Sequence, residues 1–100
     1  MDDRIDLIVQ NLKEVYDPEI PVNIYDLGLV YSVDVEGNEA KIVMTLTAPN
    51  CPAADFIVSD VEYMAKKVEG IESCKVEITY DPPWDRSMLS EEARLELGFL

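Results

Sequence analysis

The hydrophobic residues near the start of the chain recur at the spacing of a helix. Apolar positions three or four residues apart run from Ile5 to Tyr16, which follows the period of about 3.6 residues of one helix face. Asp17-Pro18 interrupts the pattern, because proline cannot continue a helix. We therefore expect a helix over about residues 4–16. Residues 17–27 contain two prolines and no clear period, which predicts a structured loop.

Strict alternation of apolar and polar residues follows in the next part of the chain. It runs through residues 29–36 and resumes over residues 40–46, with Gly37-Asn38 between them. This pair suits the positive φ angles that two-residue hairpin turns need, so the pattern predicts a β-hairpin. The residues expected to share one face of the first strand are Leu29, Tyr31, Val33 and Val35.

Helical spacing then returns between Pro52 and Gly70. Proline is favoured at the first position of a helix and glycine just past its end, so we expect a helix over about residues 52–69. Cysteine, valine, isoleucine and tyrosine then alternate with polar residues over 74–80, which predicts a third strand. Ser90 can cap a short last helix.

The predicted order α-β-β-α-β-α indicates a single two-layer α+β domain over residues 1–100, with helices on one face of a small, mixed three-stranded sheet. The hairpin makes the second strand antiparallel to the first, and the following helix returns the chain for a third strand that runs parallel to the second. Three loops should therefore meet at one edge of the sheet. These loops are residues 17–27, 47–52 and 81–84.

Composition and charge narrow the class of protein. The chain has 100 residues, 48% of them hydrophobic and 29% charged, as in one folded domain. Its net charge of −13 would repel a phosphate backbone, so nucleic acid is not an expected partner. The absence of histidine excludes Ser-His-Asp and Cys-His catalysis and histidine metal sites. No secretion signal or membrane-length apolar run occurs, so we expect a cytoplasmic protein with reduced cysteines and no membrane association.

The two cysteines have different surroundings in the predicted fold. Cys51 precedes the second helix, whose free N–H groups favour a thiolate, although Asp55 in the same turn opposes this effect. Cys51 can thus be a soft metal ligand, a nucleophile or a small residue that fills the cap position. Cys74 is in phase with the apolar face of its strand and is expected to pack in the core. The helix between them places the cysteines roughly 25 Å apart, too far for a disulfide or a shared cluster within one chain.

Polar residues of the loops can join Cys51 at the same edge. Asp17 and Glu19 flank a proline and can serve turn formation or ligand binding. Thr47 can donate a hydroxyl beside Cys51 or pack as a strand residue. Asp26 precedes Gly28 and is expected to shape the start of the first strand. Trp84 is expected to cover the edge of the core.

Four motifs stand in order along the chain: Asp17-Pro18-Glu19-Ile20, Tyr25-Asp26-Leu27-Gly28-Leu29-Val30-Tyr31, Thr45-Leu46-Thr47 with Asn50-Cys51-Pro52, and Tyr80-Asp81-Pro82-Pro83-Trp84. Together they resemble the SufT/PaaD-like metal–sulfur cluster assembly family over nearly the whole chain. The resemblance implies a small cytosolic auxiliary factor in iron–sulfur protein maturation and not an enzyme. Its partners would be the assembly machinery and client apo-proteins.

The resemblance also implies a functional cluster of Asp17, Glu19, Thr47 and Cys51, with Asp26 as a further candidate. An iron–sulfur cluster usually needs four protein thiolates, and this site offers one. We therefore expect Cys51 to contribute one thiolate to transient iron or a transient cluster, with Asp17 and Glu19 as metal-ligand candidates. A second copy of the chain, a small thiol or a client would complete the ligand set.

Two other functions stay open at this point. The chain can be a metal-free adaptor that holds scaffold and client together. It can also be a thiol-redox protein that uses Cys51, although it lacks a histidine and a resolving cysteine beside that residue.

Overall fold

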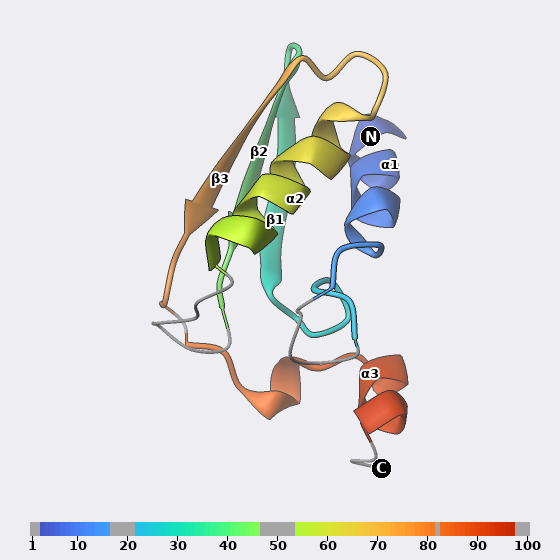
Figure 1. Cartoon of the computed structure of the whole chain (residues 1–100), viewed down its shortest axis with the longest axis vertical. Helices are drawn as coiled ribbons and strands as arrows, with labels where there is room; N and C mark the ends of the chain where they lie inside the picture. The colour runs from blue at the N-terminus through green and yellow to red at the C-terminus, as the bar shows by residue number, and fades with distance from the viewer. Residues whose placement is uncertain (1–2, 17–21, 47–53, 82, 98–100) are drawn as a thin grey trace.

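The computed structural model describes residues 3–16, 22–46, 54–81 and 83–97 (Figure 1). Its helices and strands follow the predicted order α-β-β-α-β-α, with one additional 3₁₀ helix before the last α-helix. The elements are α1 (Asp3–Leu12), β1 (Val30–Glu36), β2 (Glu39–Met44), α2 (Ala54–Lys66), β3 (Ser73–Ile78), η1 (Arg86–Met88) and α3 (Glu91–Leu97). No helix in these ranges is both long and apolar enough to span a membrane.

The sheet is mixed, as predicted, and β2 is its central strand. β2 pairs antiparallel with β1 and parallel with β3. The start of β1 and the ends of β2 and β3 therefore lie at one edge of the sheet, which we call the loop edge. Backbone hydrogen bonds extend the pairing there, from Thr45 N to Leu29 O (2.8 Å) and from Thr79 N to Met44 O (2.9 Å).

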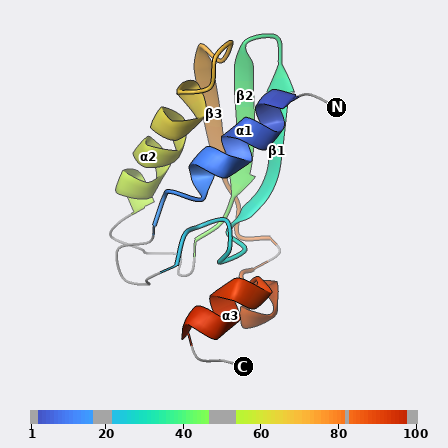
Figure 2. The same cartoon turned by 90° about the vertical axis from the view of Figure 1, so that its right-hand side faces the viewer.

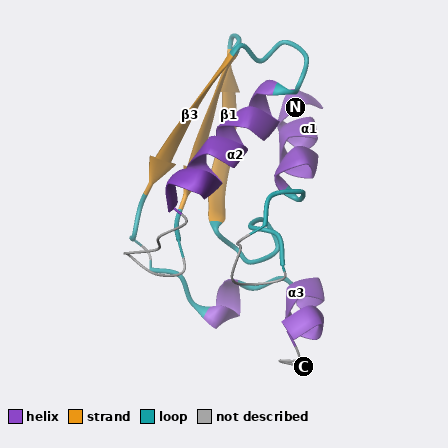
Figure 3. Ribbon diagram, viewed as in Figure 1, coloured by secondary structure: helices purple, strands orange, loops and turns teal. Residues whose placement is uncertain are grey.

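Helices α1 and α2 cover one face of the sheet (Figures 1 and 2). Their apolar stripes form the core with the inward side chains of β2, as the periodicity predicts. Fully buried examples are Ile8, Leu12, Ile42, Ile57 and Val61. The short helix α3 lies beyond the loop edge instead of on the covered face (Figure 3). Ser90 caps it, because its Oγ accepts a hydrogen bond from Ala93 N (3.1 Å).

Helix α1 ends four residues earlier than the predicted residue 16. Val15 N bonds to Leu12 O (3.1 Å) in a tightened last turn, and Val15 O then accepts a bond from Ile24 N (2.8 Å). Tyr16 forms an isolated antiparallel bridge with Asn23. The apolar residues at positions 15 and 16 thus continue the helical period but pair with the following loop. Helix α2 also ends early, at Lys66, and Gly70 follows with φ +93°.

A β-bulge in β1 corrects the predicted alternation of that strand. Val30 is paired with Met44, but Ser32 is paired with Val43, so one extra residue stands between them. As a result Val30 packs against the core together with Val33 and Val35. Tyr31 was expected on that face but leaves it, and its hydroxyl lies 3.7 Å from Met88 Sδ.

Candidate functional site

The four residues of the expected functional cluster, Asp17, Glu19, Thr47 and Cys51, lie outside the described residues. The structure does describe the residues on either side of them. The Tyr16–Asn23 bridge joins the two sides of residues 17–21. Residues 47–53 follow the buried Leu46 and precede α2. Both pairs of flanking segments lie at the loop edge (Figures 1 and 3).

Asp26 shapes the turn before β1, as the sequence suggests. Asn23 Nδ2 donates to Asp26 Oδ2 (2.8 Å), and Asp26 N donates to Asn23 Oδ1 (2.9 Å). The backbone carbonyl of Asp26 accepts a bond from Ser90 N (2.8 Å), which ties the turn to the start of α3. These contacts give Asp26 a structural role, and a role in ligand binding stays a prediction.

Trp84 closes the core at the loop edge, as expected. It is partly buried against the core, and its Nε1 donates a hydrogen bond of 2.6 Å to Leu27 O. The predicted meeting of the loops before β1 and after β3 is thus confirmed for Leu27 and Trp84. Residues 47–52, the third loop of that prediction, lie outside the described ranges except for their flanks.

Gly28 lets two segments approach each other closely beside this contact. Its φ is +81°, and an added Cβ would clash with the backbone oxygen of Met88. Only glycine adopts this conformation without strain and leaves space for the carbonyl. The structural requirement explains the glycine of the Tyr25–Tyr31 motif without any contact to a ligand.

Thr45, which is not among the candidate site residues, carries a buried polar atom. The residue is fully buried, and its Oγ1 has no hydrogen-bond partner among the residues that the structure describes. A buried polar group without a partner destabilises a protein by about 1–3 kcal/mol. The sequence contained one signal for Thr45, because it belongs to the Thr45-Leu46-Thr47 motif directly after β2. Only the second threonine of that motif, Thr47, was predicted to be a site residue.

Cys74 is a half-buried residue of β3 that packs against the core, as predicted. Burial raises the pKa of its thiol from 9.0 to about 11; Glu62 and Glu39 add to the rise, and Lys66 opposes it. The thiol is therefore protonated near neutral pH, and a protonated thiol is a poor nucleophile and metal ligand.

The start of α2 presents an exposed aromatic residue close to Cys51 in the sequence. Phe56 is 73% exposed and lies outside the apolar stripe that α2 buries. With Asp55, Ser59 and Asp60 it lines a shallow hollow of about 280 Å³. An exposed phenylalanine beside a hollow is typical of a protein contact surface, because burying it would remove apolar area from water.

The part of the chain that the structure describes contains no group of three or more Cys, Asp or Glu residues that could hold a metal ion. Within those ranges Cys74 is the only cysteine. A metal site at the loop edge would thus depend on the residues of 17–21 and 47–53.

Comparisons with known proteins find similarity to proteins of iron–sulfur cluster assembly or iron–sulfur protein maturation. Residues 5–78 match the profile of a family described as iron–sulfur cluster assembly protein. A Porphyromonas gingivalis protein described as an Fe–S protein maturation auxiliary factor is 57% identical over 94 residues, which cover 93% of this chain and 90% of that protein. The Staphylococcus aureus auxiliary factor SufT is 38% identical over 85 residues, covering 84% of this chain and 97% of SufT.

A solved structure has the same fold. The crystal structure of a domain of unknown function from Bacillus anthracis superimposes with a TM-score of 0.90 at 38% sequence identity. The superposition covers 98% of this chain and 94% of that one.

Proposed function

The chain belongs to the iron–sulfur cluster assembly protein family, and from that premise we propose that it is an auxiliary factor which delivers iron or a cluster to client apo-proteins through Cys51. The motif resemblance to SufT-like factors is confirmed by the relatives that bear this name. The proposed role is non-catalytic and cytoplasmic. It involves the assembly machinery and its clients as partners.

The chemistry proposed for the site is transient ligation of iron by one thiolate. Metal binding deprotonates a cysteine, so Cys51 does not need a low resting pKa. Asp17 and Glu19 would add oxygen ligands or balance the charge of iron, and Thr47 would donate a hydrogen bond. Since a stable cluster usually takes four thiolates, the remaining positions would be filled by a small thiol, a client or a second copy of the chain.

The observation that carries this proposal is the anchoring of both flanks at the loop edge. Asp17 directly follows Tyr16, whose bridge to Asn23 ties that loop to the turn before β1. Thr47 directly follows Leu46 at the end of β2, and Cys51 stands three residues before Ala54 of α2. The described segments that flank these residues are distant in the sequence but lie at the same edge of the sheet, which supports the proposal.

Cys74 does not offer a second thiolate for the same ion. It packs against the core from β3, and burial raises the pKa of its thiol, so its deprotonation by a metal ion would cost more free energy than that of an exposed cysteine. The cargo would therefore be held by Cys51 alone among the cysteines of one chain, which favours easy release over storage.

Anaerobic reconstitution with iron and sulfide tests this proposal. We expect visible absorption and acid-labile sulfide with the unmodified protein and with Cys74→Ser, and loss of both with Cys51→Ser. Asp17→Asn and Glu19→Gln should weaken iron retention without abolishing it. Absorption that survives Cys51→Ser and disappears with Cys74→Ser would contradict the assignment.

A metal-free adaptor is the second candidate function, and the exposure of Phe56 favours it. An adaptor needs a contact surface more than a thiolate, and Phe56 with its neighbouring hollow offers one. The two functions separate in a cluster-transfer assay with a client apo-protein. If Cys51→Ser transfers normally and Phe56→Ala does not, the adaptor function is correct. Tyr63→Ala is the matched control, because Tyr63 is also exposed on α2.

A further inference from the structure

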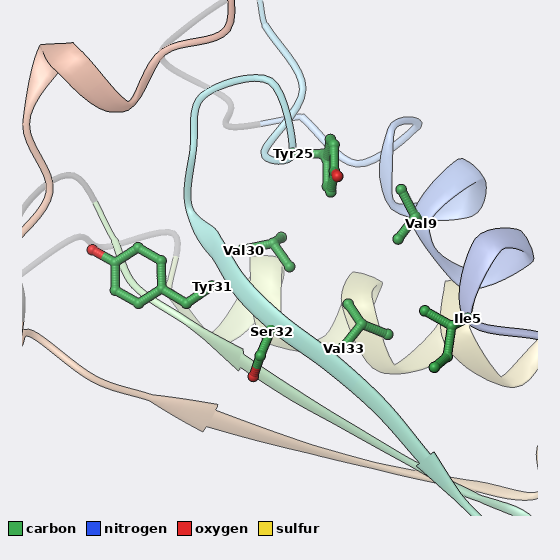
Figure 4. A pocket seen from close by; sticks show the side chains of 7 residues that line it. All are labelled: Ile5, Val9, Tyr25, Val30, Tyr31, Ser32 and Val33. Atoms are coloured by element: carbon green, nitrogen blue, oxygen red, sulfur yellow. The ribbon is translucent and has the colours of Figure 1, made fainter. Parts of the chain in front are cut away.

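Strand β1 lies at an open edge of the sheet beside a hollow into which aliphatic side chains of α1 and β1 project. It pairs with β2 on one side, and no other described strand flanks it. The hollow, of about 190 Å³, lies between β1 and α1. Figure 4 shows Ile5 and Val9 of α1 facing Val30 and Val33 of β1 across it, with Tyr25 at one end. Tyr31 and Ser32 point away from this gap (Figure 4).

The hairpin register shows which backbone groups face the open edge. Glu36 and Glu39 flank the two-residue turn and are paired, so they form a hydrogen-bonded pair. Hydrogen-bonded and non-hydrogen-bonded pairs alternate in an antiparallel ladder. Val35 and Val33 therefore belong to non-hydrogen-bonded pairs with β2, and their N–H and C=O groups point to the open side. These are the groups that another strand would bind.

The charges along β1 indicate what kind of strand would fit. Asp34 and Glu36 are exposed and alternate along β1 with Val33 and Val35, which pack against the core, so the two acids lie on the opposite face of the sheet. Opposite charges on adjacent strands stabilise pairing, and like charges destabilise it. A second copy paired through its own β1 would bring these acids close to the same acids, in a chain of net charge −13. A basic strand would meet no such repulsion.

We propose that the open edge of β1 binds an extended segment of a partner protein by strand addition. The segment alternates apolar side chains, which enter the hollow between α1 and β1, with lysine or arginine side chains, which lie beside Asp34 and Glu36. Backbone hydrogen bonds to Val33 and Val35 set its position, and the side chains select its sequence. This interaction goes beyond the proposed function, because it needs neither Cys51 nor bound iron.

A short synthetic peptide of alternating valine and lysine is the probe, titrated into isotope-labelled, metal-free protein. We expect a Kd below one millimolar, with amide shifts at Val33 and Val35 and methyl shifts at Ile5 and Val9. A peptide with the same composition in scrambled order, and one N-methylated at alternate backbone positions, should bind much more weakly. Cys51→Ser should bind like the unmodified protein, so failure of the metal proposal would not affect this result.

A charge-reversed variant provides the second test. Asp34→Lys combined with Glu36→Lys should weaken binding of the valine–lysine peptide about tenfold and favour a valine–glutamate peptide. Glu91→Lys combined with Glu96→Lys is the control, because it makes the same change in net charge at exposed sites on α3, which lies beyond the loop edge (Figure 3).

Three outcomes would overturn the proposal. The first is equal binding of the ordered and scrambled peptides, or no binding in the millimolar range. An absence of binding would mean that the bulge and the acidic residues protect the open edge from pairing. Another is a set of shifts confined to β3, the other edge strand. The third is a dimer in sedimentation equilibrium whose contacts run through β1, because the occupant would then be a second copy.

Discussion

The indole Nε1 of Trp84 donates a hydrogen bond of 2.6 Å to the backbone carbonyl of Leu27, which precedes it by 57 residues. This bond joins the turn before β1 to the segment after β3 and closes the core at the loop edge. Leu27 N also donates to Asn23 O (3.0 Å), and Thr45 N donates to Leu29 O (2.8 Å), so the described residues near both proposed site loops are tied to the same turn.

Trp84→Phe should lower the free energy of unfolding by about 1–2 kcal/mol, because it removes the donor and leaves the Leu27 carbonyl unpaired. Urea unfolding followed by far-UV circular dichroism measures this change. Fluorescence is unsuitable, since Trp84 is the only tryptophan. Tyr63→Phe, at an exposed position, is the control and should change stability by less than about 0.5 kcal/mol. Equal stability of the two variants would mean that the bond contributes nothing.

Gly28→Ala should destabilise the protein by roughly 3 kcal/mol or more, since it adds a backbone clash with Met88 O to an unfavourable φ of +81°. Gly37→Ala separates the two effects. Gly37 has φ +60° and open space around it, so only the backbone cost of about 1–2 kcal/mol applies. Thermal unfolding of both variants measures the two losses. Equal losses of stability would mean that the approach of Met88 to Gly28 adds no cost.

Thr45→Val should raise the free energy of unfolding by about 1 kcal/mol, because it replaces a buried hydroxyl that has no partner in the described part of the chain with a methyl group of similar shape. Thr45→Ser, which keeps the hydroxyl and loses the methyl, should instead lower stability. Chemical denaturation of the pair provides the comparison. A Val variant less stable than the unmodified protein would show that the hydroxyl has a partner in solution.

Cys74 should make stability depend on pH in the alkaline range. Because burial raises the pKa of its thiol from 9.0 to about 11, the folded state retains a proton that the unfolded state loses between these values. The contribution of the protonated Cys74 thiol to the free energy of unfolding is complete below pH 9 and is lost as the pH rises through about 11. The difference in unfolding free energy between the unmodified protein and Cys74→Ala isolates this effect from other alkaline titrations. A difference that stays constant from pH 8 to 11 would contradict the raised pKa.

Local sequence patterns predicted the order of elements, the mixed sheet and most of the core. They succeeded because apolar residues that recur every 3.6 residues in a helix, or every two residues in a strand, lie on one face of that element. Residues such as Ile42 and Val61 lie where that repeat places them. The turn at Gly37-Asn38 and the cap at Ser90 were equally local, since each depends on the conformation or side chain of one or two residues.

The candidate site was recognised from motifs rather than from periodicity. Four short motifs pointed to Asp17, Glu19, Thr47 and Cys51, and the roles of these four residues stay predictions. The structural role of Asp26 followed from its place before Gly28, whereas the buried Thr45 hydroxyl and the exposed Phe56 became apparent only in the folded chain.

Tertiary contacts decided the features that break a local pattern. Val15 keeps the helical spacing but lies past the end of α1, where its carbonyl accepts a hydrogen bond from Ile24 N, and Tyr31 leaves the strand alternation at a bulge set by pairing with β2. Gly28 is required by the approach of Met88, sixty residues later in the chain. The chain's own apolar spacing determined what each segment prefers to form. Hydrogen bonds and close packing with distant residues determined where each segment stops, because their energies exceed the small local preferences at the ends of helices and strands.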